Sequence, residues 1–218
     1  MKQPDPTEQR VVLPNVSWRQ FQALQQEVEG DTRLTYWGNR LEMMTPLPDH
    51  QRCRNLLDSL IQLIADVRSQ SIRAIAPVVL LDSHQLCAIS PDAVYYRDPP
   101  PLPDDRIDVI PQIDIVQMPP PNLALEIVLN ASSVDKFPIY ASLGIEEVWR
   151  GQLQPHRNQP LQLKMTLHRL QDDGYSPIPA SELFPAVTPA VIQNFIDQSE
   201  TLSLVKALTL LRAWADAA

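Results

Sequence analysis

The sequence has little of what would support a disulfide framework, a cysteine zinc site or a membrane span. Its 218 residues include two cysteines, Cys53 and Cys87. Two cysteines are too few for a disulfide framework or a cysteine-rich zinc site, so a reducing cytoplasm is the expected compartment. No apolar run approaches the ~20 residues that span a bilayer, and the first ten residues lack the apolar segment of a signal peptide. Membrane insertion and secretion are therefore not expected.

Glycine and positive charge are also scarce. The glycines form no P-loop, no dinucleotide-binding fingerprint and no G-x-S-x-G motif. Eighteen Lys and Arg residues stand against 26 Asp and Glu residues, which gives a net charge of −8. This balance disfavours non-specific coating of nucleic acid, which needs a basic field, but it leaves room for a local basic groove.

Proline is in excess. The sequence has 22 prolines, about twice the ~5% average usage, and eight of them fall between Arg97 and Asn122. We expect a long connection over 97–121, partly polyproline II, with a short extended piece at 113–116. A second connection is expected at 151–160.

The hydrophobic pattern predicts one mixed α/β domain. Apolar residues recur at helical spacing over 48–69, and Gly38-Asn39 separates two short apolar runs as a hairpin turn does. Residues 122–129 are apolar on both faces apart from one acid, as in a central strand. Further helices are expected at 17–30, 135–143 and 189–216, and further strands at 76–82, 91–96, 146–150 and 161–167.

The length of the chain limits it to one domain, or one domain with an appendage, at roughly 100–200 residues per domain. We expect an N-terminal tail at 1–16, a domain at 17–198 that carries the Pro-rich insertion, and a C-terminal helix at 199–218.

Two acids are the strongest candidates for chemistry. Glu126 lies inside the apolar strand, where an unpartnered carboxylate costs several kcal/mol, so a metal, a basic group or the open end of the sheet must compensate it. The simpler alternative is a strand-end glutamate that faces solvent. Asp92 follows Pro91 at the entry of a neighbouring strand, although Pro-Asp is also common turn chemistry. Two carboxylates on adjacent strands suit a hard divalent cation such as Mg²⁺.

Two further charged residues are weaker candidates. Lys136 follows Glu126 by ten residues, at the start of the next helix, where it could offset the carboxylates or orient water. It could equally be a solvated lysine at a helix start. Glu42 lies on the predicted hairpin, where it could equally be the outward residue of an alternating strand.

Five segments in a fixed order carry a family resemblance: GNRLEMMTPLPDH (38–50), SPDAVYY (90–96), PPPNLALEIV (119–128), DKFPIYASLGIEEVWRGQL (135–153) and SELFPAV (181–187). Together they resemble the Uma-type restriction-endonuclease-like proteins, a family abundant in cyanobacteria, within the PD-(D/E)XK nuclease superfamily. The resemblance covers roughly residues 17–198.

The resemblance implies a three-layer α/β core with a mixed central sheet, and metal-dependent hydrolysis of phosphodiester bonds in DNA. Asp92 matches the aspartate of the motif, Glu126 its second acid, Glu42 the upstream glutamate, and Lys136 a helix lysine. Mg²⁺ or Mn²⁺ would be held by Asp92, Glu126 and the backbone carbonyl of Ile127. Double-stranded DNA is the implied partner, and a two-fold dimer would suit cleavage of both strands.

The chain departs from the family pattern in three places. Val128 stands where the superfamily has a lysine, and Arg150 stands where many relatives have an aspartate after the tryptophan. Residues 130–133 replace a Ser-Pro-Ser-Thr loop. These departures, with the net charge of −8, leave an alternative open: a catalytically degenerate nuclease fold that acts as a nucleic-acid-binding or assembly module.

Overall fold

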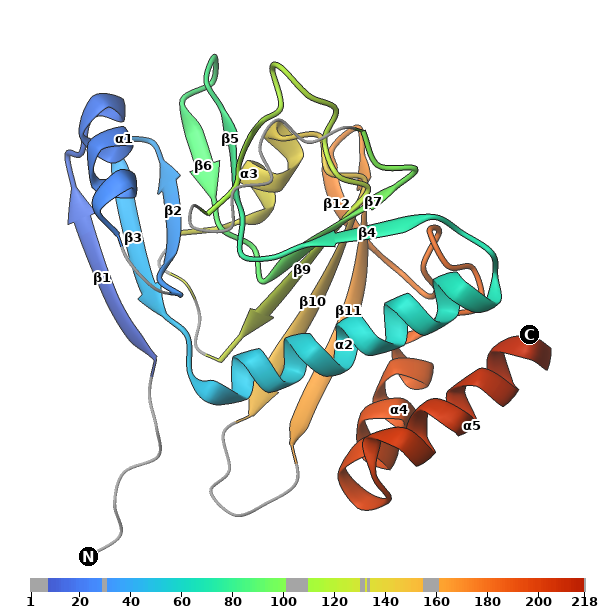
Figure 1. The fold of residues 1–218 in the computed structure, drawn as a ribbon. Coiled ribbons are helices and arrows are strands. Elements are labelled where there is room, and N and C mark those ends of the chain that lie inside the picture. Colours follow the sequence, from blue (N-terminus) through green and yellow to red (C-terminus); the bar gives the residue numbers. More distant parts are fainter. Residues whose placement is uncertain are drawn as a thin grey trace, which may run out of the picture.

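Two six-stranded mixed sheets form the framework of the computed structural model, which describes residues 8–28, 31–100, 110–129, 132, 134–154 and 161–217 (Figure 1). The first sheet has the strand order β1 (Gln9–Pro14), β3 (Arg40–Thr45), β2 (Arg33–Trp37), β6 (Cys87–Ile89), β5 (Val79–Asp82) and β8 (Gln112–Asp114). Its pairs are antiparallel except β5–β8.

Helix α1 (Trp18–Glu27) packs on the β2–β3 hairpin. The Ser17 side chain accepts a hydrogen bond from the Gln20 N–H, and the Gln20 side chain accepts one from the Ser17 N–H, so the helix begins with a capping box. Phe21 stacks on Tyr36 of β2 at a centroid distance of 4.9 Å. The predicted capped helix and hairpin are both confirmed.

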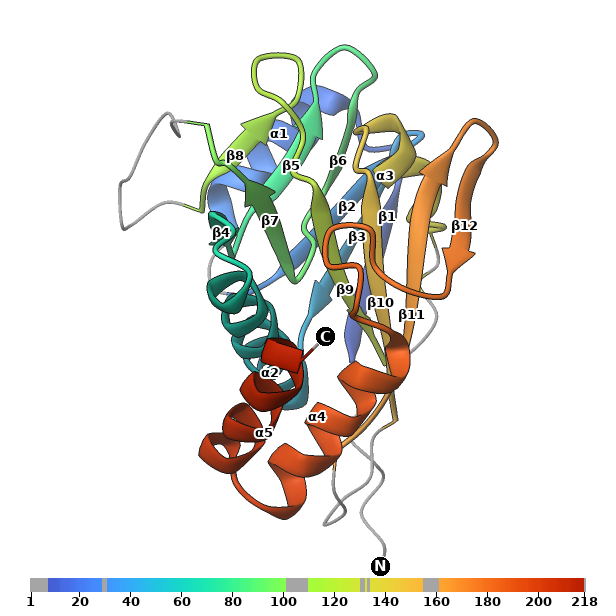
Figure 2. The same ribbon diagram turned by 90° about the vertical axis from the view of Figure 1, so that its right-hand side faces the viewer.

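The second sheet has the strand order β12 (Gly174–Ile178), β11 (Gln162–Gln171), β10 (Glu147–Gln154), β9 (Leu123–Val128), β7 (Ala93–Arg97) and β4 (Ile72–Ile75). The β9–β10 pair is parallel and the others are antiparallel. Helices α2 (Pro48–Val67), α4 (Pro189–Thr201) and α5 (Leu204–Ala217) lie along one face of this sheet (Figure 2). Helix α3 (Phe137–Ser142) packs against the opposite face.

The alternation of side chains along β9 places Glu126 on the α3 face. Leu123, Leu125 and Ile127 belong to the core under α2, whereas Ala124 belongs to the core that includes α3. Because residues i and i+2 of a strand share a face, Glu126 and Val128 point to the same side as Ala124.

The chain passes from the first sheet to the second immediately before Asp92. Ser90, at the end of β6, donates its N–H to the Leu34 carbonyl at 2.7 Å, and its hydroxyl accepts the Leu34 N–H at 3.2 Å. These bonds fix the crossing point against β2. Asp92 therefore lies where the two sheets meet.

The prediction of a mixed α/β fold with C-terminal helices is confirmed, but there are two mixed sheets where one central sheet was expected. The connections β4–β5 and β6–β7 each carry the chain from one sheet to the other. Residues 9–14, inside the predicted tail, form β1 and pair with β3.

The predicted connections are only partly described. The second one begins later than expected, because residues 151–154 still belong to β10. Residues 101–109 and 155–160 of the two connections lie outside the described residues, whereas the extended piece expected at 113–116 corresponds to β8. In the described part of the chain, no helix is long and apolar enough to cross a bilayer.

Candidate active site

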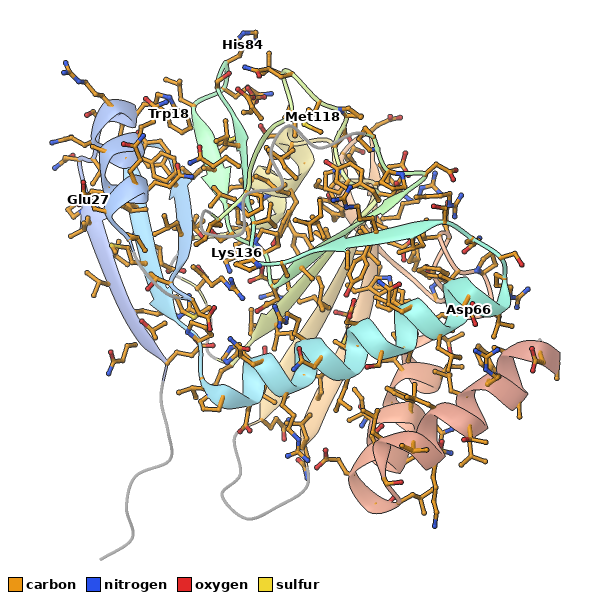
Figure 3. The ribbon with its side chains drawn as sticks, in the orientation of Figure 1. Trp18, Glu27, Asp66, His84, Met118 and Lys136 are labelled. Carbon is orange, nitrogen blue, oxygen red and sulfur yellow. The ribbon has the colours of Figure 1, made fainter. Side chains whose placement is uncertain are left out.

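Glu126 is a buried carboxylate held by two donors from the segment that follows β9. The residue is 4% exposed. Oε1 accepts a hydrogen bond from Nζ of Lys136, and Oε2 accepts one from the Tyr140 hydroxyl at 2.6 Å. Lys136 immediately precedes α3, and Figure 3 shows it in the interior, between the β2–β3 hairpin and β9. The strand, the loop and the helix thus converge on one carboxylate.

Asp92 lies beside Glu126 at the start of β7. Ala93 pairs with Leu125, so continuing the antiparallel register places Asp92 opposite Glu126. Asp92 is 4% exposed, and its Oδ2 accepts the Ile127 N–H at 2.6 Å. The two predicted acids share one face of the sheet at the meeting point of the two sheets.

The electrostatic environment of Asp92 reflects this proximity. Burial raises the pKa of the Asp92 carboxyl, and the negative charge of Glu126 raises it further. The Arg33 guanidinium and the Ile127 N–H lower the pKa but do not cancel the rise. Two acids are thus held close together at an energetic cost, which is a common property of functional sites.

Arg33 is a site residue that the sequence did not reveal. It begins β2, is 6% exposed, and places its Nε 3.9 Å from Oδ1 of Asp92. Among the described residues, this Nε has no hydrogen-bond partner. A single arginine at the start of a strand gives no sequence signal, because its proximity to Asp92 depends on how the two sheets pack.

Glu42 lies on β3 and reaches the loop after β9. Its Oε1 accepts hydrogen bonds from Nη1 of Arg10 at 2.5 Å and from the Ser132 hydroxyl at 2.7 Å. Ser132 in turn lines the same cavity as Glu126. The predicted upstream glutamate is therefore connected to the site through this serine.

A second buried carboxylate network supports the end of β9. Glu8 accepts hydrogen bonds from Arg10 at 2.5 and 3.0 Å, from the Leu129 N–H at 3.0 Å, and from Nε2 of His50 at 2.8 Å. Nδ1 of His50 accepts the Leu47 N–H, so Nε2 carries the proton and donates. Burial raises the pKa of Glu8, but the bonds from His50 and Arg10, the Arg10 charge and the Leu129 N–H lower it to about 2.

A cavity of about 250 Å³ opens beside Glu126. Its wall combines carboxylate, cationic, aromatic and aliphatic groups, from Glu126, Val128, Ser132, Val134, Asp135, Lys136, Phe137, Tyr140, Val148 and Arg150. Neither Asp92 nor Arg33 belongs to this wall, so the cavity extends from the Glu126 side of the acidic pair.

The acidic pair offers the donor chemistry that Mg²⁺ requires. Magnesium takes one or two protein carboxylates and completes its shell with water and phosphate oxygens. Because the N–H and C=O of one strand residue point to the same side, and the Ile127 N–H bonds Asp92, the Ile127 carbonyl also faces Asp92. The described residues contain no cluster of three or more His, Cys, Asp or Glu able to hold a metal. Two carboxylates and a backbone carbonyl are donors of the kind that Mg²⁺ accepts together with water.

Comparison with known proteins agrees with this fold. A structure from Anabaena variabilis ATCC 29413, described as "a putative nuclease belonging to DUF820", aligns with a TM-score of 0.52 over 88% of this chain and 99% of that one. Its 12% identity supports likeness of fold alone. The fold is thus of the kind found in that protein.

The sequence model of the Uma2 family, described as "Putative restriction endonuclease", matches residues 18–200. The chain belongs to the Uma2 family, and the predicted resemblance is confirmed. No curated protein matches the sequence.

Sequence reasoning found the acids but missed most of their partners. The structure brings together Asp92, Glu126 and Lys136, as expected. Of the missed residues, Tyr140 could have been found, because it follows Lys136 by four residues and so shares its side of the helix. Glu8 and Arg10 were assigned to a tail and could not have been found locally.

Proposed function

We propose that this protein is a divalent-metal-dependent endonuclease that hydrolyses phosphodiester bonds in DNA. The observation that carries the proposal is the pairing of two buried carboxylates, Asp92 and Glu126, on neighbouring strands, with Lys136 bonded to one of them. Membership of the Uma2 family supports the same reaction class.

Each residue of the site has a separate role in the proposed hydrolysis. Asp92, Glu126 and the Ile127 carbonyl would hold Mg²⁺ or Mn²⁺, which would neutralise the scissile phosphate and acidify a water. Lys136 orients Glu126 and brings positive charge to the place where the phosphate gains negative charge in the transition state. Tyr140 fixes the second oxygen of Glu126. Glu42 positions Ser132 at the rim of the site.

A second candidate is a catalytically inactive binding or assembly module. It is favoured by the bonding of Glu126, since both of its oxygens already accept hydrogen bonds from protein donors. In that case the Glu126–Lys136 pair is a structural ion pair, and the apolar Val128 in place of the superfamily lysine reflects loss of catalysis.

Plasmid nicking separates the two candidates. The native protein should convert supercoiled plasmid to the nicked form with Mg²⁺ or Mn²⁺ and not with EDTA. Asp92→Asn and Glu126→Gln should each reduce the rate by about 100-fold or more, because metal contacts supply several kcal/mol of transition-state stabilisation.

Asp66→Asn is the matched control, since Asp66 is an exposed carboxylate on α2, far from Lys136 in Figure 3. It should nick at the native rate. Nicking that persists in Asp92→Asn, or that EDTA does not stop, would refute the proposal. Absence of nicking by the native protein with either metal would favour the binding module.

A further inference from the structure

The cavity beside Glu126 includes groups of the proposed site, and the rest of its wall suggests what it holds. Its wall extends from Glu126 to residues of β10 and α3, whereas neither Asp92 nor Arg33 lines it. A phosphate held at Asp92 and Glu126 would have the cavity as its neighbour. The group attached to that phosphate would therefore lie at the cavity mouth.

The cavity wall has flat and apolar surfaces together with hydrogen-bonding groups. Val128 and Val148 form an aliphatic side. Arg150 stacks over Phe137, with its guanidinium carbon 5.5 Å from the ring centroid. The Arg150 guanidinium also supplies hydrogen-bond donors. Unpaired bases bind in this way, with their faces on aromatic rings or arginine planes and their edges on polar groups.

The size of the cavity restricts its occupant to one base. Pockets for drug-sized ligands measure about 300–1,000 Å³, and this cavity of about 250 Å³ falls below that range. A base pair would not enter it. A single base would have to be unpaired or turned out of the duplex to do so.

We propose that the cavity binds one unpaired nucleobase of DNA, next to the phosphate held at Asp92 and Glu126. The proposal rests on the proposed function for the position of that phosphate. Its consequence is a preference for DNA with an unpaired nucleotide over fully paired DNA.

The test is binding in EDTA, where cleavage does not interfere, to two labelled duplexes that differ by one bulged nucleotide. The native protein should bind the bulged duplex about tenfold more tightly, as expected from the stacking of one base. With 2-aminopurine as the bulged base, its fluorescence should change on binding. Equal affinity for the two duplexes would overturn the proposal.

Two variants test whether the preference for the bulged duplex depends on the cavity. Val128→Phe fills the cavity and should abolish the preference for the bulged duplex. Arg150→Gln should reduce the preference several-fold. If Val128→Phe does not fold, Arg150→Gln alone tests whether the cavity binds the unpaired base. Arg68→Gln, at the exposed C-cap of α2, removes one positive charge elsewhere and should leave the preference intact.

The binding preference and plasmid nicking test the base pocket and the nuclease activity separately. A preference that survives in Val128→Phe and Arg150→Gln would overturn the base pocket even if the protein nicks plasmid. A preference that both variants lose would support the pocket even if the native protein does not nick plasmid.

Discussion

At the scale of single residues, the charge of Glu126 is balanced by that of Lys136, and both side chains are largely buried. The two side chains are 5% and 10% exposed, so water screens their interaction little. Removal of one partner of such a pair leaves the other charge buried and uncompensated, whereas removal of both does not.

Substitutions at Lys136 and Glu126 should therefore change the free energy of unfolding non-additively. In EDTA, Lys136→Met should lower the free energy of unfolding by about 3 kcal/mol, because Glu126 is left without its cation. The double variant Lys136→Met/Glu126→Gln should regain much of that loss. Urea denaturation of the native, single and double variants measures the coupling. Single losses that simply add in the double variant would show that the two charges do not interact.

At the scale of elements, β1 and the residue before it are attached to the site by charged side chains. Glu8, directly before β1, bonds to His50 of α2 and to the Leu129 N–H at the end of β9, and Arg10 of β1 bonds to Glu42 of β3. These bonds hold the end of β9, the strand that carries Glu126, while β1 also pairs with β3.

The Glu8 contacts predict a specific loss of stability in acid. Its pKa falls from an ordinary 4.5 to about 2 in the folded protein, so its contribution is fully present above pH 4.5 and is lost as the pH falls toward 2. A shift of this size corresponds to up to about 3 kcal/mol. Glu8→Gln should therefore be less stable than the native protein at pH 6, and the difference should shrink at pH 3. Urea denaturation at the two pH values checks this, and a difference independent of pH would contradict it.

The elements also show how far the sequence alone could predict the fold. Helix α2 and strand β9 were predicted correctly because their apolar residues are continuous and strongly periodic. The strands β1, β6 and β12 were missed because they are short or carry few apolar residues, and pairing partners distant in sequence stabilise them. The hydrogen bond from the Leu129 N–H to Glu8 could not be predicted for the same reason, since the two residues are 121 positions apart. Local pattern identified the acids, but only the packing of two sheets brought Arg33 to Asp92.

At the scale of the whole molecule, the candidate site residues gather where the two sheets meet. The first sheet contributes Arg33 and Glu42, the second contributes Glu126, and Asp92 lies on the connection between them. A net charge of −8 disfavours the approach of DNA to the protein as a whole. A metal ion and a few local cations would have to provide the attraction at this one place.

The most direct test of the account is thermal unfolding during titration with Mg²⁺ or Mn²⁺. A cation that binds the acidic pair in the folded state stabilises the protein by mass action, so millimolar metal should raise the Tm of the native protein. The gain should shrink in both Asp92→Asn and Glu126→Gln and remain in Asp66→Asn. A Tm that does not change across the titration, or a gain that survives in both site variants, would contradict the claim that Asp92 and Glu126 form a divalent-metal site.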